Sequence, residues 1–295
     1  MADAASEPIM NLEQVHRRAE TARTVHDVVH ALRSVAAGRI HRAQIAADAS
    51  DRYYALVVRA LGSLAADALP RRATASHSGQ TGLLVLTSEQ PLCGKLAQNV
   101  VELAVERREE LARNGPPLLM VVGRRGVRQL ASRGVAADVQ EPGATSTAGL
   151  HDLVKRLAAT LAARYHSGEL AEVRVIYGRY VSLSEQVPTE EQLLPPNMAE
   201  LQAQGSKHRR IYSRYMPADE LGQALLTEYA FIALYRIAAQ MLTSEQAARL
   251  VAMDGATRTA ERMMQTLRVQ ENQARQEKIT NDVLELVAVR FATGT

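Results

Sequence analysis

Large aromatic side chains are the scarcest feature of this sequence. It has no Trp and only two Phe, and aromatic residues make up 4% of the chain. The core of a compact enzyme usually buries more large rings than this. A thin seam between two helices, by contrast, can be filled by Leu, Val, Ile, Met and Ala. The scarcity therefore favours an elongated helical assembly over a compact enzyme.

Cysteine is almost as rare. Cys93 is the only one, so no internal disulfide can form, and a reducing compartment is expected. No window reaches the ~18 consecutive apolar residues of a membrane-spanning helix. The first residues also lack the charged segment and apolar stretch of a signal peptide. We expect no direct membrane span, and any membrane association should come through partners.

Charge of one sign is not concentrated anywhere. The formal net charge is +3, and Arg is interleaved with Asp and Glu along most of the chain. A dedicated nucleic-acid surface should show a basic stripe, so we expect no nucleic-acid partner. The small positive excess is compatible with binding acidic protein loops.

Proline is absent from two long stretches. None occurs between Pro8 and Pro70, and none follows Pro217. Because proline interrupts helix interiors, residues 11–69 and 219–292 can each form one helix. Helices of this length, roughly 85 Å and more than ~100 Å at 1.5 Å per residue, persist only when they pair. The sequence therefore predicts a long antiparallel coiled coil, in which Gly38 would mark a close approach of the helices.

Apolar residues recur at helical spacing in both stretches and predict which side chains form the seam. In the first helix they are Val25, Val28, Leu32 and Val35, then Ala36, Ile40, Ala43 and Ala47, and finally Tyr54, Val57, Leu61, Leu64 and Ala68. In the last helix they are Leu250, Met253, Thr257, Ala260, Met264 and Leu267, followed by Ile279, Val283 and Leu286.

The middle of the chain has a different periodicity. Residues 81–87, 118–122 and 172–181 read as strands, and residues 92–113, 124–133 and 150–165 read as helices. This alternation predicts a small Rossmann-like α/β domain with largely parallel strands, inserted between the shaft helices. Residues 184–216 are expected to form a loop and an edge hairpin. The expected division is a shaft helix over 1–75, the α/β domain over 76–217 and a second shaft helix over 218–295.

No group of residues forms a credible catalytic, cofactor-binding or metal site. The chain lacks a P-loop, and the turn Gly123–Gly126 lacks the glycine pattern of a dinucleotide fingerprint, so a plain strand-to-helix turn is favoured. Cys93 has no evident basic partner and is interpreted as a small buried hydrophobe. His26 and His30 have metal-compatible spacing but no third ligand. The pair Glu190–Glu191 is interpreted as loop surface.

The C-terminal stretch carries the most specific motif. It reads SEQAARLVAMDGATRTAERMMQTL and then NQARQEKITNDVLELV. These segments, together with RRAETARTVHDVVHALRSVAAGRIHRAQ near the N-terminus, resemble the gamma subunit of F-type ATP synthases. The matching positions are Ser244, Glu245, Arg249, Ala252, Met253, Ala256, Thr257, Asn272, Arg275, Gln276, Ile279 and Thr280. The central segments LTSEQPLCGK and VIYGRYVSLSEQVPTEEQLLP resemble the same family more weakly.

The sequence also departs from the family pattern. Glu89-Gln90-Pro91 replaces the usual acidic-Arg-Gly before Leu-Cys-Gly, and Leu32-Arg33-Ser34 stands where many members have Met-Lys-Met. Ala288-Val289 replaces a terminal Gly-Ala pair. These changes suggest a divergent branch, for which a second-operon, sodium-type ATPase is one candidate.

The resemblance implies a mechanical role. The chain would be the central rotor stalk, without a catalytic site of its own, inside a hexamer of alpha and beta subunits. It would also contact an epsilon subunit and a membrane ring of c subunits, on the cytoplasmic face of the bacterial inner membrane. Arg275, Gln276, Thr280 and Arg33 would contact an acidic beta-subunit loop. The helix end, with Val283, Leu286, Val287 and Phe291, would turn in an apolar sleeve, or pack in the coil near Val35.

Two other functions fit the composition and periodicity. One is a coiled-coil tether or adaptor with an inserted α/β module. The other is a small α/β enzyme whose helical extensions drive oligomerisation. Only a rotor subunit should associate with alpha and beta subunits and show no activity alone.

Overall fold

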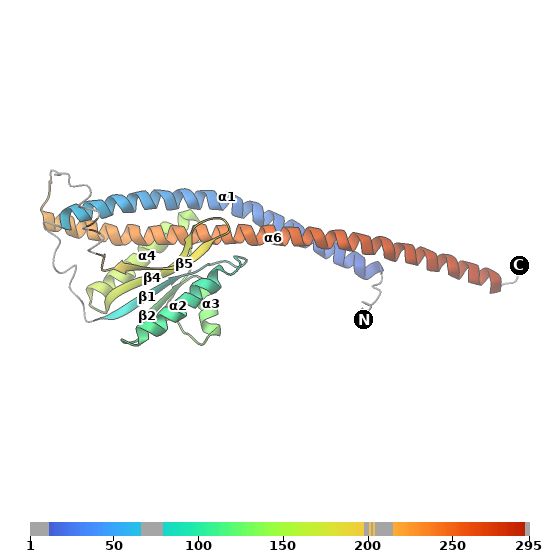
Figure 1. Ribbon diagram of the computed structural model, residues 1–295, viewed down its shortest axis with the longest axis horizontal. Helices are drawn as coiled ribbons and strands as arrows, with labels where there is room; N and C mark the ends of the chain where they lie inside the picture. Colours follow the sequence, from blue (N-terminus) through green and yellow to red (C-terminus); the bar gives the residue numbers. More distant parts are fainter. Residues whose placement is uncertain (1–11, 66–78, 198–200, 202, 204–214, 293–295) are drawn as a thin grey trace. The chain divides into compact units, whose positions relative to one another are not determined.

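The computed structural model describes residues 12–65, 79–197, 201, 203 and 215–292, except for the side chains of residues 65, 219, 291 and 292 (Figure 1). The chain divides into two compact units. The coil unit comprises residues 1–34 and 253–295, and the sheet unit comprises residues 35–252. Two long helices, α1 (Leu12–Ala65) and α6 (Ala218–Ala292), contribute residues to both units.

A mixed sheet forms the centre of the sheet unit. Its strands are β1 (Gln80–Leu86), β2 (Leu118–Val122), β3 (Val139–Glu141), β4 (Leu170–Tyr180) and β5 (Gln186–Leu194). They lie in the order β3-β2-β1-β4-β5. The first four are parallel, and β5 pairs antiparallel with β4 at the edge. The order 3-2-1-4 is that of a dinucleotide-binding half-sheet, so the Rossmann-like prediction is confirmed.

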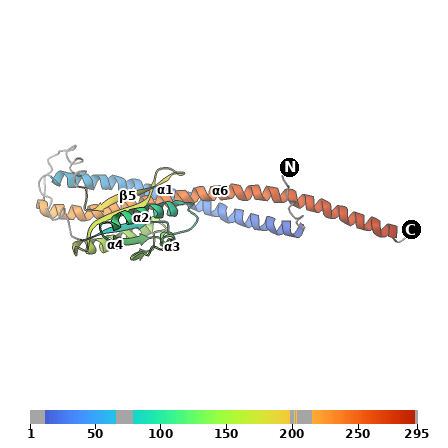
Figure 2. The ribbon, with the colours of Figure 1, turned by 60° about the horizontal axis from the view of Figure 1, so that its bottom comes forward.

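Helices cover both faces of this sheet (Figures 1 and 2). On one face lie α2 (Leu96–Ala112) and α3 (Arg124–Ser132). On the other lie α4 (Thr147–His166) and the sheet-unit part of α6, joined by a ring contact between His151 and Phe231. Because both faces are covered, the strands read as continuous apolar runs, and Leu83, Leu84 and Val85 are fully buried.

Within the sheet unit, α1 and α6 pair in opposite directions. The ring centres of Tyr54 and Tyr229 lie 5.7 Å apart, whereas Asp51 lies 4.0 Å from Arg236. Leu61 and Leu234 are fully buried and belong to the same core as the sheet. Burying each such leucine contributes about 1.5–3 kcal/mol. The paired helices and the sheet thus share one apolar core.

The coil unit also contains an antiparallel pair, but its seam is thin. His16 lies 3.4 Å from Glu271, His26 lies 3.8 Å from Glu261, and Arg33 lies 3.2 Å from Asp254. Its buried apolar cluster consists of Val15, Ala22 and Leu267, with Ala19 and Met264 packed against it. The predicted architecture, two long pairing helices with an α/β insertion between them, is confirmed.

The predicted seam of α1 is wrong in its first third. Val25, Val28 and Val35 are 48%, 54% and 49% exposed, although they were expected to face α6. Val15 and Ala22 are buried there instead, whereas Ala36, Ile40, Ala43 and Ala47 are buried as predicted. The later seam positions Val57, Leu61 and Leu64 are buried as predicted, and Ala68 lies outside the described residues. On α6, Met253, Thr257, Ala260 and Leu267 are buried as predicted, but Ile279, Val283 and Leu286 are exposed.

Four local predictions need correction. A Cβ on Gly38 would meet nothing within 4 Å, so this glycine marks no close helix approach. Helix α2 begins at Leu96 rather than residue 92, because Leu92 and Gly94 have φ values of 69° and 54° that no α-helix accepts. The short strand β3 was not predicted. Glu190 and Glu191 lie in the edge strand β5 and not in a surface loop.

The expected divisions at residues 75 and 217 stay predictions. None of the helices in the described ranges combines the length and the apolar character that crossing a bilayer requires.

Candidate functional site

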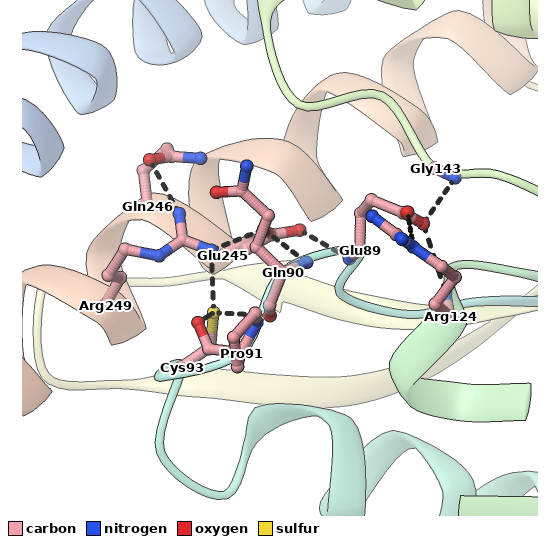
Figure 3. Close-up of polar contacts among 9 residues, drawn as sticks. All are labelled: Glu89, Gln90, Pro91, Cys93, Arg124, Gly143, Glu245, Gln246 and Arg249. Atoms are coloured by element: carbon pink, nitrogen blue, oxygen red, sulfur yellow. Dashed lines mark hydrogen bonds and ion pairs between the residues drawn. The ribbon is translucent and has the colours of Figure 1, made fainter. Parts of the chain in front are cut away.

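The carboxyl end of β1 is where sheets of this topology receive a ligand's phosphate. In this chain a side chain occupies that place. Glu89, in the turn after β1, is 6% exposed. Its Oε2 accepts hydrogen bonds from the backbone N–H groups of Arg124 at 3.1 Å and Gly143 at 2.9 Å, and the Arg124 guanidinium also contacts it (Figure 3). The Glu89 carboxylate therefore neutralises the start of α3 as a bound anion would.

Three effects set the charge of Glu89. Burial raises the pKa of its carboxyl, but the N–H groups of Gly143 and Arg124 and the Arg124 guanidinium outweigh that and lower the pKa below its usual value. The carboxylate is therefore ionised at neutral pH. With this anion built in, the turn Gly123–Gly126 is a strand-to-helix turn and not a phosphate cradle.

The turn after β1, which contains Glu89, is held to α6 by a buried ion pair. Arg249 donates to Glu245 Oε1 at 2.6 Å, and the two side chains are 7% and 3% exposed. Glu245 in turn accepts the backbone N–H of Glu89 at 3.1 Å and that of Gln90 at 3.5 Å (Figure 3). One carboxylate on α6 thus orders the backbone that follows β1. Burial, the largest influence, raises the pKa of Glu245.

Cys93 also has a basic partner, contrary to the sequence-based prediction. Arg249 Nη2 lies 3.0 Å from Cys93 Sγ, and the thiol donates to the carbonyl of Gln90 at 3.4 Å. Burial and the Glu245 carboxylate raise the pKa of the thiol to about 12, more than the Arg249 charge lowers it. Because the thiolate is the nucleophile, this protonated Cys93 is a structural residue, as predicted.

The residues that match the family's beta-loop contact lie on the exposed end of α6. Arg275, Gln276 and Thr280 are all exposed. Arg275 lies 3.9 Å from Glu271, which also contacts His16. Gln276 and Thr280 are one turn apart, and the Thr280 hydroxyl donates to the Gln276 carbonyl at 2.9 Å. Their side-chain donors and acceptors face outward and can meet a partner.

Arg33 does not join this group. It pairs with Asp254, 21 positions before Arg275 on α6, which corresponds to roughly 30 Å along the helix. The expectation that Arg33 faces the same region as Arg275 is therefore wrong in register. Its side chain is 45% exposed and remains accessible.

The end of α6 carries apolar side chains that nothing covers within the described residues. Val283, Leu286 and Val287 are 52%, 71% and 44% exposed. The side chain of Phe291, the fourth expected member, lies outside the described residues. Leu284 and Val289 are exposed too, so the apolar surface is wider than the single side expected. The alternative, packing of this end beside Val35, stays a prediction.

The polar network around Glu89 was missed at the sequence level. Residues Thr243 to Gln246 are polar yet at most 2% exposed, and Ser244 donates to the Gly178 carbonyl at 2.7 Å. One signal could have revealed the network. Glu245 and Arg249 lie four residues apart, and Glu245 belongs to the polar run Thr243–Gln246, which follows an apolar stretch of α6. A polar run of this kind needs partners when it is buried.

Comparisons with known proteins cover nearly the whole chain. A family described as ATP synthase matches residues 11–290. The ATP synthase gamma chain of Dinoroseobacter shibae is 31% identical over 292 residues, covering 94% of this chain and 98% of that protein. The gamma chain of Moorella thermoacetica is 31% identical over 284 residues, covering 94% of this chain and 97% of that protein.

Solved structures share the fold. A chain of the Euglena gracilis mitochondrial ATP synthase (OSCP/F1/c-ring, rotational state 3) has a TM-score of 0.66 at 16% identity, covering 96% of this chain and 94% of that one. A chain of the central stalk and c-ring of the Tetrahymena thermophila enzyme has a TM-score of 0.55 at 18% identity, covering 78% and 99%. Sequence and fold agree, and this chain belongs to the ATP synthase family, among its gamma chains.

Proposed function

We propose that this chain is the central rotor-stalk subunit of an F-type ATP synthase. The observation that supports this best is the near full-length match to gamma chains, combined with two long antiparallel helices and an inserted α/β sheet. In this role the chain transmits torque between an ion-driven ring of c subunits and the catalytic hexamer of alpha and beta subunits. An epsilon subunit completes the stalk.

The chain itself performs no chemistry in this proposal. It acts as a moving ligand that favours a different beta-subunit conformation at each rotation angle. The side chain of Glu89 fills the place where a sheet of this order would bind a nucleotide phosphate, which supports a role other than nucleotide binding. The subunit is peripheral, at the cytoplasmic face of the bacterial inner membrane, and the transported ion is H⁺ or Na⁺.

We further propose that Arg275, Gln276 and Thr280 contact an acidic beta-subunit loop. A charge-assisted hydrogen bond from Arg275 can hold the rotor at one angle and still release it. The apolar side chains of Val283, Leu286, Val287 and Phe291 would turn within a sleeve formed by the hexamer. Arg33 would make a separate contact, because it lies opposite Asp254.

Co-expression with alpha and beta subunits tests these assignments. We expect a complex with three alpha and three beta subunits per copy of this chain, and no ATPase activity from this chain alone. Failure to assemble with these subunits, or turnover of a substrate by the chain alone, would contradict the proposed function and favour a tether or an enzyme.

The Arg275 contact has its own test in vesicles that contain the whole enzyme. Arg275→Ala should lower ATP synthesis by about tenfold to a hundredfold, the effect of losing one charged hydrogen bond of about 1.5–3 kcal/mol. Arg262→Ala is the matched control, because Arg262 is also exposed but lies on a different side of α6. Equal synthesis rates for the two variants would reject the Arg275 contact.

A further inference from the structure

A polar cluster lies at the β5 edge of the sheet, where four elements meet. We name the edge clamp as Tyr54 on α1, Tyr177 on β4, Glu191 on β5 and Arg236 on α6. One Arg236 guanidinium nitrogen, Nη2, donates to Glu191 Oε2, and the Tyr177 hydroxyl donates to Glu191 Oε1. The Arg236 Cζ also lies 4.6 Å from the centre of the Tyr54 ring. Both carboxylate oxygens of Glu191 are therefore engaged.

Two neighbours extend the clamp across the helix pair. Gln240 Nε2 donates to Asp51 Oδ1 at 3.3 Å, and Gln240 Oε1 lies 3.3 Å from the Tyr177 hydroxyl. Arg236 Nη1 lies 4.0 Å from the same Asp51 oxygen. Through these contacts a single strand edge is joined to both α1 and α6.

The clamp is buried and charged. Tyr177 is fully buried, and the side chain of Arg236 is 14% exposed. Burial by itself lowers the pKa of Arg236, but the facing Glu191 outweighs it and raises that pKa. Burial and Glu191 both raise the pKa of the Tyr177 hydroxyl, which keeps its proton to donate. The Arg236 guanidinium therefore keeps its charge beside Glu191, whose side chain is 29% exposed.

Glu190, the neighbour of Glu191, points to the opposite face of the sheet, as alternation along a strand requires. It contacts Arg107 on α2 at 2.8 Å and Arg174 on β4 at 3.1 Å. The edge strand is thus attached by ion pairs to helices on both faces. Without these ion-pair partners, two adjacent and partly buried glutamate carboxylates on an edge strand would destabilise the fold.

A joint between a sheet and a helix pair can transmit torque only if its contacts have a fixed direction. Apolar attraction between the sheet and the helices is non-directional. A carboxylate held by a guanidinium and a hydroxyl has a fixed geometry, and buried ionic groups can specify an arrangement without adding stability. The covalent links between the sheet and the helices are residues 66–79 and 195–217, one before β1 and one after β5.

We propose that the edge clamp sets the angle of the α/β sheet on the α1–α6 pair, so that force applied to the sheet turns the helices. This inference rests on the proposed rotor function. The clamp acts through positioning, because none of its residues is among the expected partner contacts. Its loss should weaken the coupling between ATP hydrolysis and ion movement, while the fold persists.

The test replaces the ion pair by apolar residues of similar size, as Glu191→Leu with Arg236→Met. The double variant is measured in the complete ATP synthase in inverted vesicles, as ion uptake per ATP hydrolysed, with H⁺ and Na⁺ uptake both recorded. We expect this ratio to fall about fivefold, the lower end of typical coupling between sites. The melting temperature of the purified full chain should be unchanged or higher, because such replacements are often neutral or stabilising.

A matched control is Arg164→Met with Glu169→Leu, an exposed pair that joins α4 to the start of β4 and does not involve α1 or α6. An unchanged ratio in the clamp variant, or an equal fall in the control, would overturn the inference. If the double variant does not assemble, Glu191→Gln keeps the side-chain shape, and an unchanged ratio in that variant also overturns it. Failure of the unmodified chain to support ion uptake would overturn both the rotor function and the clamp.

Discussion

Two ion pairs on α6 share a spacing but differ in their surroundings. Glu245–Arg249 and Asp254–Arg258 both place the acid four residues before the arginine, and both have an N–O distance of 2.6 Å. The first pair, in the sheet unit, is 3% and 7% exposed, whereas the second, in the coil unit, is 29% and 71% exposed. The spacing and the N–O distance are the same and the acids differ by one methylene, so burial is expected to dominate any difference in their effect.

The same contrast separates the two units. The sheet unit surrounds its polar groups with a continuous apolar core, and each buried charge has several partners. The coil unit has a thin seam, with alanine at two buried positions, Ala22 and Ala260, and histidine–carboxylate pairs along it. Water screens such exposed pairs, and each contributes little. The sheet unit should therefore respond strongly to single changes, and the coil unit weakly.

The largest effect should come from removing one member of the buried pair. Arg249→Ala leaves the Glu245 carboxylate without its cation and removes a donor to Cys93 Sγ. We expect a loss of about 3–5 kcal/mol in the free energy of opening of the sheet unit. Hydrogen exchange of the full-length chain, read by mass spectrometry over β1 and the sheet-unit part of α6, measures this locally.

Arg258→Ala is the control with identical spacing. It should lower the free energy of opening of the coil unit by less than about 0.5 kcal/mol, which is the contribution of an exposed ion pair on a helix. Glu245→Gln combined with Arg249→Met should recover most of the loss, because it leaves no unpaired charge. Similar costs for Arg249→Ala and Arg258→Ala would show that burial does not govern these pairs.

Much of the fold could be predicted because its signals are local. The apolar runs of β1 and β2 and the absence of proline from residues 12–65 and 218–292 are visible in the sequence. The phase of the α1 seam was not predictable, because the helix carries two apolar stripes and only the partner decides between them. Val25 and Val28 were expected in the seam by their spacing, yet the structure exposes them and buries Ala22. Three-residue β3 lacks the periodicity of a strand and was missed, whereas β5 lies within the edge hairpin expected over residues 184–216.

The residues of the candidate site likewise divide into those that a local motif predicts and those that only the fold brings together. Arg275, Gln276 and Thr280 were found because a motif of fixed spacing contains them. The pairing of Arg249 with Cys93, 156 positions apart, could not be found without the fold. The predicted position of Arg33 was wrong for a related reason. The register of an antiparallel pair is set by the whole seam, and the sequence of one helix does not reveal it. Long-range contacts among polar residues leave little trace in local periodicity.

Two glycine substitutions give a smaller test of the same contrast. A Cβ at Gly126 would lie 2.4 Å from the Thr87 hydroxyl oxygen, whereas a Cβ at Gly255 would meet nothing within 4 Å. Gly126→Ala should therefore destabilise the sheet unit by about 1–3 kcal/mol through overpacking. Gly255→Ala should stabilise the coil unit by about 0.5–1 kcal/mol, because alanine favours the helix. Hydrogen exchange over each unit measures both, and a stabilising Gly126→Ala would contradict the close packing at Thr87.

The smallest effect should appear as a pH dependence at Glu89. The pKa of its carboxyl is lowered from the ordinary 4.5 in the folded chain, so the unfolded chain binds more protons at acidic pH. The stability that Glu89 contributes is therefore complete above the ordinary pKa and is lost as the pH falls through the lowered folded value. Glu89→Gln cannot titrate and should show a shallower loss of sheet-unit stability below about pH 4.5.

Hydrogen exchange between pH 3 and pH 6, corrected for the intrinsic exchange rate, compares the two chains. Residues 253–290 of the coil unit serve as an internal reference, because Glu89 and its partners lie in the sheet unit. Their opening should depend on pH equally in both chains. A wild-type sheet unit that loses no more stability in acid than Glu89→Gln would mean that the N–H groups of Arg124 and Gly143 do not hold the carboxylate ionised.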